Sequence, residues 1–248
     1  MYSEKIKNTL LMQNRLNLKG NLYHKTQIDF AYNNNLLEGS TITIDETESI
    51  YDTGTILTNK DKVINLKDAT ETKNHFTLFK YMLDTLDEPL TEVLIKKFHF
   101  ILKSGTLKDD EVGIINIGEY KSLKNFVENI TTSSPKNVST DMKKLLDWYN
   151  KINNKSVEDI IEFHVRFESI HPFQDGNGRV GRMIIFRECL VNDIMPFYIE
   201  ERNKPFYIRG IKEYQTNNEK GYLIDTCLNS QDNYEKLAKY FLEDWFKV

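Results

Sequence analysis

One short segment of the sequence gathers most of the residues that could do chemistry. Residues 170–182 read Ile-His-Pro-Phe-Gln-Asp-Gly-Asn-Gly-Arg-Val-Gly-Arg. Pro172 ends the apolar helical pattern before it, because the residue before a proline is disfavoured in the helical conformation. A second apolar helical pattern begins near Asn177, so a glycine-rich loop opens onto a helix N-terminus. Backbone N–H groups there lack partners and the helix dipole is positive, which suits an anion.

Charged side chains in the same segment would complete a site for a polyphosphate. Arg179 and Arg182 are three residues apart on one helical face, where two guanidinium groups above unpaired N–H groups would hold phosphates. Asp175 offers a hard oxygen ligand beside them, which is how proteins usually hold Mg²⁺. His171, just before the loop, can accept a proton near neutral pH. Each feature alone is common, but a single phosphate site explains all of them.

Two other phosphate-binding motifs fit the sequence less well. Residues 176–181 match the pattern G-x-G-x-x-G, but a dinucleotide-binding loop needs a β-strand before it. Residues 156–170 instead repeat apolar side chains at helical spacing. The P-loop pattern G-x-x-x-x-G-K-[ST] is absent from the sequence.

The segment resembles the signature of the Fic (filamentation induced by cAMP) family, H-x-F-x-[DE]-G-N-G-R-x-x-R. All of its defined positions match, namely His171, Phe173, Asp175, Gly176, Asn177, Gly178, Arg179 and Arg182. Residues 118–121 are similar to the family's G-E-Y-R stretch, and the resemblance extends over residues 24–225.

This resemblance implies an enzyme that transfers AMP from ATP to a Ser, Thr or Tyr hydroxyl of a protein. His171 would be the general base, and Asp175 would hold Mg²⁺ between the α- and β-phosphates. The nucleotide-binding residues would be Gly176, Asn177, Gly178, Arg179, Arg182 and Tyr207. Arg179 would bind the β-phosphate and Arg182 the γ-phosphate. For Tyr207, a contact with the adenine or ribose and an ordinary core position both stay open.

The resemblance also assigns a flap that would pair, strand to strand, with the target protein. Its edge would be Leu123, Lys124, Asn125, Phe126 and Val127, within a short β-hairpin predicted over residues 112–127. Strand pairing uses backbone groups and is largely blind to sequence, so this segment does not identify the target.

A third assignment concerns the N-terminal part of the chain. Leu37-Glu38-Gly39 fits the end of the family's inhibitory helix, [ST]-x-x-x-E-[GN], with Asn34 at the Ser/Thr position. Glu38 is predicted to restrain the enzyme by pairing with Arg182, because a carboxylate can take the place of a phosphate on a guanidinium group. The alternative is an exposed carboxylate at a helix end. We expect Asn34 to hold this helix less firmly than Ser or Thr would.

The elements that must position these residues are predicted to be mainly helical. The fold class is all-α with a short β-hairpin flap, as one compact unit. Helices are predicted over 4–16, 24–38, 66–86, 91–103, 139–152, 156–170, 177–192, 203–216 and 220–246. We divide the chain into an N-terminal helical segment with the candidate inhibitory helix (1–60), a catalytic core (61–225) and a C-terminal helix (226–248).

Composition limits the other classes of function. The chain has 248 residues, 40% hydrophobic and 28% charged, as in soluble globular proteins. A net charge of −4 disfavours nucleic-acid binding, and apolar runs are too short for a membrane span. The N-terminus lacks a signal-peptide pattern, so we expect a cytoplasmic protein. Cys189 and Cys227 lack metal-binding spacing.

The expected partners are ATP and a target protein or the protein itself, and homo-oligomer formation stays open. Two alternative functions also stay open. One is a Fic-fold enzyme that uses another phosphate-containing donor or removes AMP. The other is a non-catalytic regulator on the same scaffold.

Overall fold

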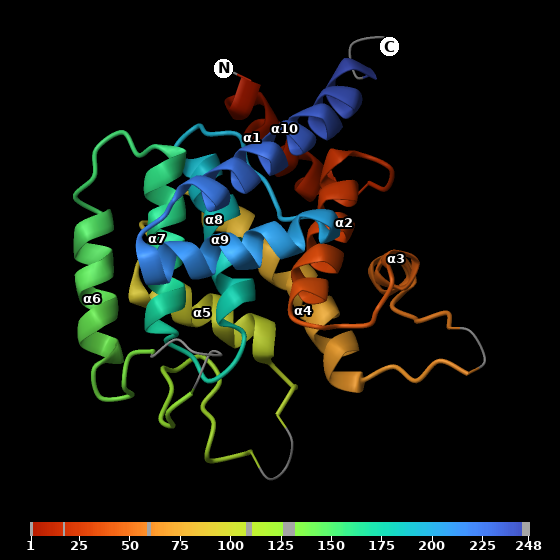
Figure 1. Cartoon of the computed structure of the whole chain (residues 1–248). Coiled ribbons are helices and arrows are strands. Elements are labelled where there is room, and N and C mark those ends of the chain that lie inside the picture. The colour runs from red at the N-terminus through yellow and green to blue at the C-terminus, as the bar shows by residue number, and fades with distance from the viewer. Residues whose placement is uncertain (1, 17, 59–60, 108–110, 126–131, 245–248) are drawn as a thin grey trace.

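Helices connected by turns and loops make up the described part of the chain (Figure 1). The computed structural model describes the whole chain except residues 1, 17, 59–60, 108–110, 126–131 and 245–248. The helices are α1 (Tyr2–Leu16), α2 (Leu22–Leu37), α3 (Ile44–Thr53), α4 (Leu66–Asp84), α5 (Glu92–Lys103), α6 (Val138–Tyr149), α7 (Val157–Ile170), α8 (Asn177–Val191), the 3₁₀ turn η1 (Glu201–Asn203), α9 (Lys204–Asn217) and α10 (Gly221–Asp244). The prediction of a mainly helical fold is confirmed.

Local sequence signals account for the helix on each side of the motif. Ser156 caps α7 and forms a reciprocal capping box with Asp159, which satisfies backbone groups that a helix start leaves unpaired. The C-terminal end of α7 is at Ile170, followed by His171 and Pro172, so the helix ends at the proline as predicted. From Asn177 to Leu190 each residue of α8 is buried, so this helix forms the centre of the molecule. It packs against α7, α5, α4, α2 and α1.

One helix was not predicted from the sequence. Helix α3 begins at a capping box in which Thr43 and Glu46 exchange side-chain and backbone hydrogen bonds. The T-x-x-E spacing is a helix-start signal, but few apolar residues follow it. Gly54 then ends the helix in the left-handed conformation, with φ of +69°.

The β-hairpin flap predicted over residues 112–127 is not shown, since the described residues hold no β-strand and only an isolated bridge between Val112 and Ile115. Turns occupy this segment instead: the N–H groups of Ile114 and Ile115 both donate to the carbonyl of Glu111. Such local bonds use the backbone groups that strand pairing would need. Phe126 and Val127 lie outside the described residues.

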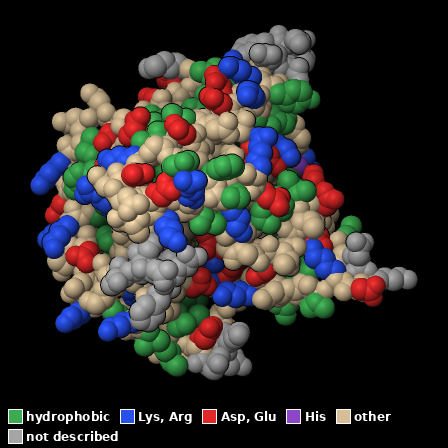
Figure 2. All heavy atoms as spheres, viewed as in Figure 1, with side chains coloured by type: hydrophobic (Ala, Val, Ile, Leu, Met, Phe, Trp, Pro, Cys, Tyr) green, Lys and Arg blue, Asp and Glu red, His purple; other side chains and the backbone are tan. Residues whose placement is uncertain are grey.

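The surface charge and the length of the helices bear on the expectations about nucleic-acid binding and membrane spans. On the face drawn in Figure 2, basic and acidic side chains are scattered among one another rather than gathered by sign. No helix in the described ranges is both long and apolar enough to cross a membrane.

Aromatic packing fixes α2 against α8. The Phe30 ring stacks on Phe186 and Tyr198, with centroids 5.3 and 5.8 Å away, and meets His75 edge-on at 5.0 Å. Because α2 carries Glu38 just past its end and α8 carries the two arginines, this contact sets the distance between them.

We therefore expect Phe30→Ala to destabilise the protein by about 3–5 kcal/mol, since it opens a cavity at a fully buried site. Chemical denaturation measures the free energy of unfolding. Met12→Ala, at a 39% exposed position, is the matched control and should change it by less than about 1 kcal/mol. Similar values for both variants would contradict this role of Phe30.

Candidate active site

The motif loop is closed by one side chain. Asn177 accepts a hydrogen bond from the backbone N–H of Phe173 at 2.8 Å and donates one to the Phe173 carbonyl at 2.9 Å. His171 ends α7 in the left-handed conformation, and Gly176 takes the same conformation at the start of α8. The loop therefore turns sharply twice and leaves the N-terminus of α8 facing a pocket.

The pocket has a volume of about 300 Å³ and contains most of the predicted site. Its lining includes Glu38, Glu168, His171, Asp175, Gly176, Asn177, Gly178, Arg182 and Tyr207. These residues come from the end of α2, from α7, from the motif loop, from α8 and from α9. Segments that are far apart in the sequence thus meet at one cavity.

His171 has the state that a general base requires. Its side chain is 18% exposed, and Nδ1 lies 3.9 Å from Glu168 Oε2. Burial, with a smaller contribution from the Lys121 ammonium group, lowers the pKa of His171 to about 4. The imidazole is therefore neutral at pH 7 and can take up a proton. Burial also raises the pKa of the Glu168 carboxyl to about 8.

Arg182 is buried, and α2 supplies its partners. Its Nη2 lies 2.5 Å from Glu38 Oε1 and donates to the Asn34 carbonyl at 3.2 Å. Its Nε donates to Asn34 Oδ1 at 2.5 Å. Burial alone would raise the pKa of Glu38, but Arg182 holds it below the ordinary value. A Cβ atom at Gly178 would collide with the Glu38 carboxylate, so this glycine leaves room for an anion.

The Asn34 side chain also bonds to groups beyond Arg182. Its Nδ2 lies 2.9 Å from His75 Nε2 and donates to the Arg179 carbonyl at 3.3 Å. We expected Asn34 to hold its helix less firmly than Ser or Thr would. These contacts do not support that expectation, because the Asn34 side chain joins α2 to both α4 and α8.

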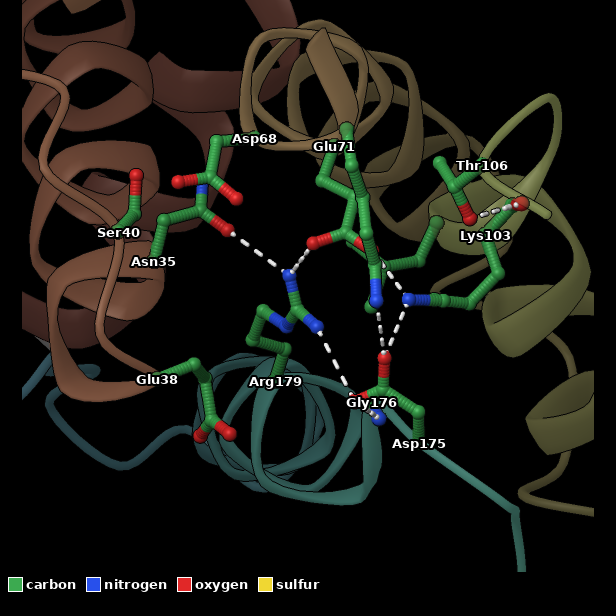
Figure 3. Close-up of polar contacts among 12 residues, drawn as sticks. Asn35, Glu38, Ser40, Asp68, Glu71, Lys103, Thr106, Asp175, Gly176 and Arg179 are labelled. Carbon is green, nitrogen blue, oxygen red and sulfur yellow. Dashed lines mark hydrogen bonds and ion pairs between the residues drawn. The ribbon is translucent and has the colours of Figure 1, made fainter. Parts of the chain in front are cut away.

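Arg179 belongs to a buried network of ion pairs (Figure 3). Glu71 on α4 pairs with Arg179 through one carboxylate oxygen and with Lys103 on α5 through the other. Lys103 Nζ also lies 2.7 Å from Asp175 Oδ2, and Lys67 Nζ lies 3.0 Å from the same oxygen. Burial alone would raise the pKa of Asp175, but Lys103, Arg179 and Lys67 together hold it well below its ordinary value. Side chains from three helices, α4, α5 and α8, therefore converge on the motif carboxylate.

His99, which the sequence analysis did not select, supports the motif loop through two hydrogen bonds and a ring contact. The backbone N–H of Gly118 donates to His99 Nδ1 at 2.9 Å, so Nε2 carries the hydrogen and donates to the Asp175 carbonyl at 3.1 Å. The ring stacks on Phe173 with centroids 3.9 Å apart. Its pKa falls to about 3 because of burial, which keeps the ring neutral. His99 thus joins α5, the turn at Gly118 and the motif loop.

The other predicted residues lie around the pocket in different roles. Tyr207 is 4% exposed, and its hydroxyl lies 2.5 Å from His164 Nε2, so it both packs in the core and lines the pocket. Asn125 donates to the Phe173 carbonyl at 3.0 Å and accepts from Lys121 Nζ at 2.6 Å. Leu123 and Lys124 are exposed beside it. The base of the predicted flap is therefore attached to the motif loop.

The donor set suits a cation that arrives with a nucleotide rather than a resident metal. The residues that the structure describes include no cluster of three or more His, Cys, Asp or Glu side chains able to hold a metal ion. Asp175 is a single carboxylate, and Mg²⁺ bound with a nucleotide takes its remaining ligands from phosphates and water. Such an ion would compete with Lys67 and Lys103 for Asp175 Oδ2.

Comparison with known proteins agrees with this arrangement. Residues 89–188 match the model of the Fic/DOC family. This segment is a Fic domain. The chain is 23% identical over 172 residues to protein adenylyltransferase fic-1 of Caenorhabditis elegans, which covers 66% of this chain and 32% of the relative. It is 27% identical over 165 residues to protein adenylyltransferase Fic of Nematostella vectensis, over 62% of this chain and 35% of that protein. The matched part thus spans about a third of these relatives.

Solved structures share the fold of the whole chain around this Fic domain. A Fic domain containing signaling protein from Bacteroides thetaiotaomicron superposes with a TM-score of 0.73 at 22% identity, over 96% of this chain and 94% of that one. Fic-1 from C. elegans gives a TM-score of 0.70 at 15% identity, over 98% of this chain and 72% of that one.

The lowered pKa of His171 leads to a prediction that requires no substrate. With a pKa of about 4, the imidazole is neutral at all pH values above about 5, whereas an ordinary histidine gains its proton near pH 6.5. The ring signals of His171, assigned by their loss in His171→Gln, should move by only about a tenth of a full protonation shift between pH 8 and 5 in an NMR titration. A midpoint near pH 6.5 would contradict the environment described for this residue.

Proposed function

We propose that the protein is an adenylyltransferase that transfers AMP from ATP to a Ser, Thr or Tyr hydroxyl of a protein, with Glu38 as a built-in inhibitor. The observation that carries this proposal is the meeting of a neutral imidazole, an open helix N-terminus and Arg182 around one pocket. The names of the relatives, protein adenylyltransferases, support the same reaction.

In this reaction, the target hydroxyl gives its proton to His171 while its oxygen attacks the α-phosphorus of ATP. A new O–P bond forms, the bond between the α-phosphorus and the bridging oxygen breaks, and pyrophosphate leaves with the electron pair. The protein contributes position and charge, which is the usual means of catalysis in phosphoryl-type transfer. Neutral His171 suits the first step, because only the free base can accept the proton.

The phosphates would take the positive groups at the start of α8. The N–H groups of this helix and Arg182 would bind them, and Arg179, held by Glu71, would approach the β-phosphate from the buried side. Mg²⁺ carried by ATP would be held at Asp175, where it would offset phosphate charge. Tyr207 would lie beside the nucleoside, since it lines the same cavity.

The target would pair with the proposed flap, whose described residues 123–125 are attached to the motif loop through Asn125. Asn125 and Lys121 fasten the base of this segment to the motif loop, so a bound hydroxyl would keep a fixed distance from His171. Modification of the protein itself is a natural first assay, because it needs no identified target.

Removal of AMP is the second candidate, and the position of Glu38 favours it. Its carboxylate lines the same pocket as His171 and could hold an attacking water. A non-catalytic role agrees less well with the structure, because the groups proposed for the base, the metal ligand and the γ-phosphate contact, His171, Asp175 and Arg182, all line one cavity.

Loss of the general base should abolish transfer and spare binding. We expect Glu38→Gly/His171→Ala to lose at least about 10²-fold of the self-modification rate of Glu38→Gly, as is typical for a general base. ATP affinity, measured by calorimetry, should change little because the imidazole acts on the hydroxyl. Near-normal transfer by the double variant would exclude His171 as the base.

Release of Arg182 should activate the protein. We expect Glu38→Gly to raise the initial rate of self-modification by about 10²-fold, because a misplaced α-phosphate costs a factor of that order. Mass spectrometry at equal ATP and Mg²⁺ concentrations measures it, and Glu48→Gln, at an exposed position on α3, is the control. Equal rates would mean that Glu38 does not inhibit, and a lower rate would assign it a direct catalytic role.

A further inference from the structure

We propose that Lys67 is a phosphate-binding residue of this site, held in the free protein by Asp175 and transferred to the phosphates when a nucleotide binds. The inference rests on the proposed function, because it adds a residue from outside the motif to the same nucleotide site.

The backbone of Lys67 is held in a helix, whereas its side chain is partly exposed. The residue lies in the first turn of α4, where its N–H donates to the N-cap side chain of Asn65 at 2.9 Å. Its ammonium group lies 3.0 Å from Asp175 Oδ2, and its side chain is 38% exposed. Lysine has a flexible four-carbon stem, so the charge can move while the helix stays in place.

Asp175 does not need Lys67 for its own stability. Lys103 is 4% exposed and already pairs with the same oxygen at the shorter distance of 2.7 Å. The charges of Lys103 and Arg179 already balance those of Glu71 and Asp175, so this group of ion pairs does not require Lys67 for its charge balance. An ion pair that is partly exposed stabilises a protein by only about 0–1 kcal/mol, which is a weak structural reason for a second lysine.

The ammonium group of Lys67 lies near the place where an anion would bind, because Asp175 is next to the start of α8. Asp175 Oδ1 accepts a hydrogen bond from the N–H of Gly176 at 2.6 Å, at the open start of α8. A phosphate at this helix start would therefore lie beside the carboxylate and within reach of Lys67. The ammonium group has three N–H donors, so it can donate to phosphate oxygens while Lys103 keeps Asp175 Oδ2 paired, whether or not a cation enters with the nucleotide.

Nucleotide binding without a metal isolates this contribution. The probe is ADP with a chelator, because ADP lacks the γ-phosphate for which Glu38 competes in the proposed function. By calorimetry we expect Lys67→Met to bind ADP about ten-fold more weakly than the wild type, the size of one charged hydrogen bond. The ADP affinity of Lys67→Arg, which keeps the positive charge, should stay within about two-fold of that of the wild type. Lys73→Met, at an exposed position on the same helix, should bind ADP with the affinity of the wild type.

A second pair of variants separates direct contact from simple neutralisation of Asp175. In an Asp175→Asn background the carboxylate charge is gone. If Lys67 only neutralises that charge, its removal should then no longer change the ADP affinity. A persistent loss of ADP affinity in Asp175→Asn/Lys67→Met relative to Asp175→Asn supports direct contact with phosphate. Equal affinities would overturn the proposal, and so would ADP binding by Lys67→Met at the affinity of Lys73→Met.

The proposed function can fail separately. If the wild type does not bind ADP and Glu38→Gly does not bind ATP, there is no nucleotide site and both proposals fall. If Glu38→Gly binds ATP and transfers AMP while Lys67→Met binds ADP normally, the role of Lys67 alone is wrong.

Discussion

Two guanidinium groups buried at the start of the central helix dictate much of this structure. Removing a cation from water costs several kcal/mol unless a partner is supplied, so Arg179 and Arg182 each require a carboxylate inside the molecule. The chain brings Glu71 from α4 to the first and Glu38 from the end of α2 to the second. The helices around α8 must therefore pack so that these side chains meet, and the pocket lies where they do.

The two carboxylates differ in a way that bears on function. Glu71 is 4% exposed and shared between Arg179 and Lys103, so it stays in the folded core. Glu38 is 32% exposed, lies just past the last turn of α2 and lines the pocket. A phosphate could displace the second carboxylate without disturbing the core, whereas displacing the first would remove a partner from two buried cations at once. This difference supports the proposal that Arg182 is the point of regulation and Arg179 a fixed part of the site.

Local patterns predicted the motif loop and most helices, because caps, prolines and apolar spacing act within a few residues. The resemblance to the family's inhibitory helix, carried by Leu37-Glu38-Gly39, predicted the pairing of Glu38 with Arg182. Neither signal pointed to His99 or Lys103, whose contacts with Asp175 join residues more than seventy positions apart. The hairpin expected over residues 112–127 was inferred from apolar residues with Gly113 and Gly118 between them. In the described part, turn hydrogen bonds take the backbone groups that it would have used.

The central claim is that Glu38 and a γ-phosphate compete for Arg182. Only ATP carries that phosphate, so the ratio of ATP to ADP affinity reports the competition directly. Calorimetry of both nucleotides with the wild type and with Glu38→Gly gives this ratio without any target protein. We expect a clearly larger preference for ATP over ADP in Glu38→Gly than in the wild type. The same ratio in both proteins would contradict it.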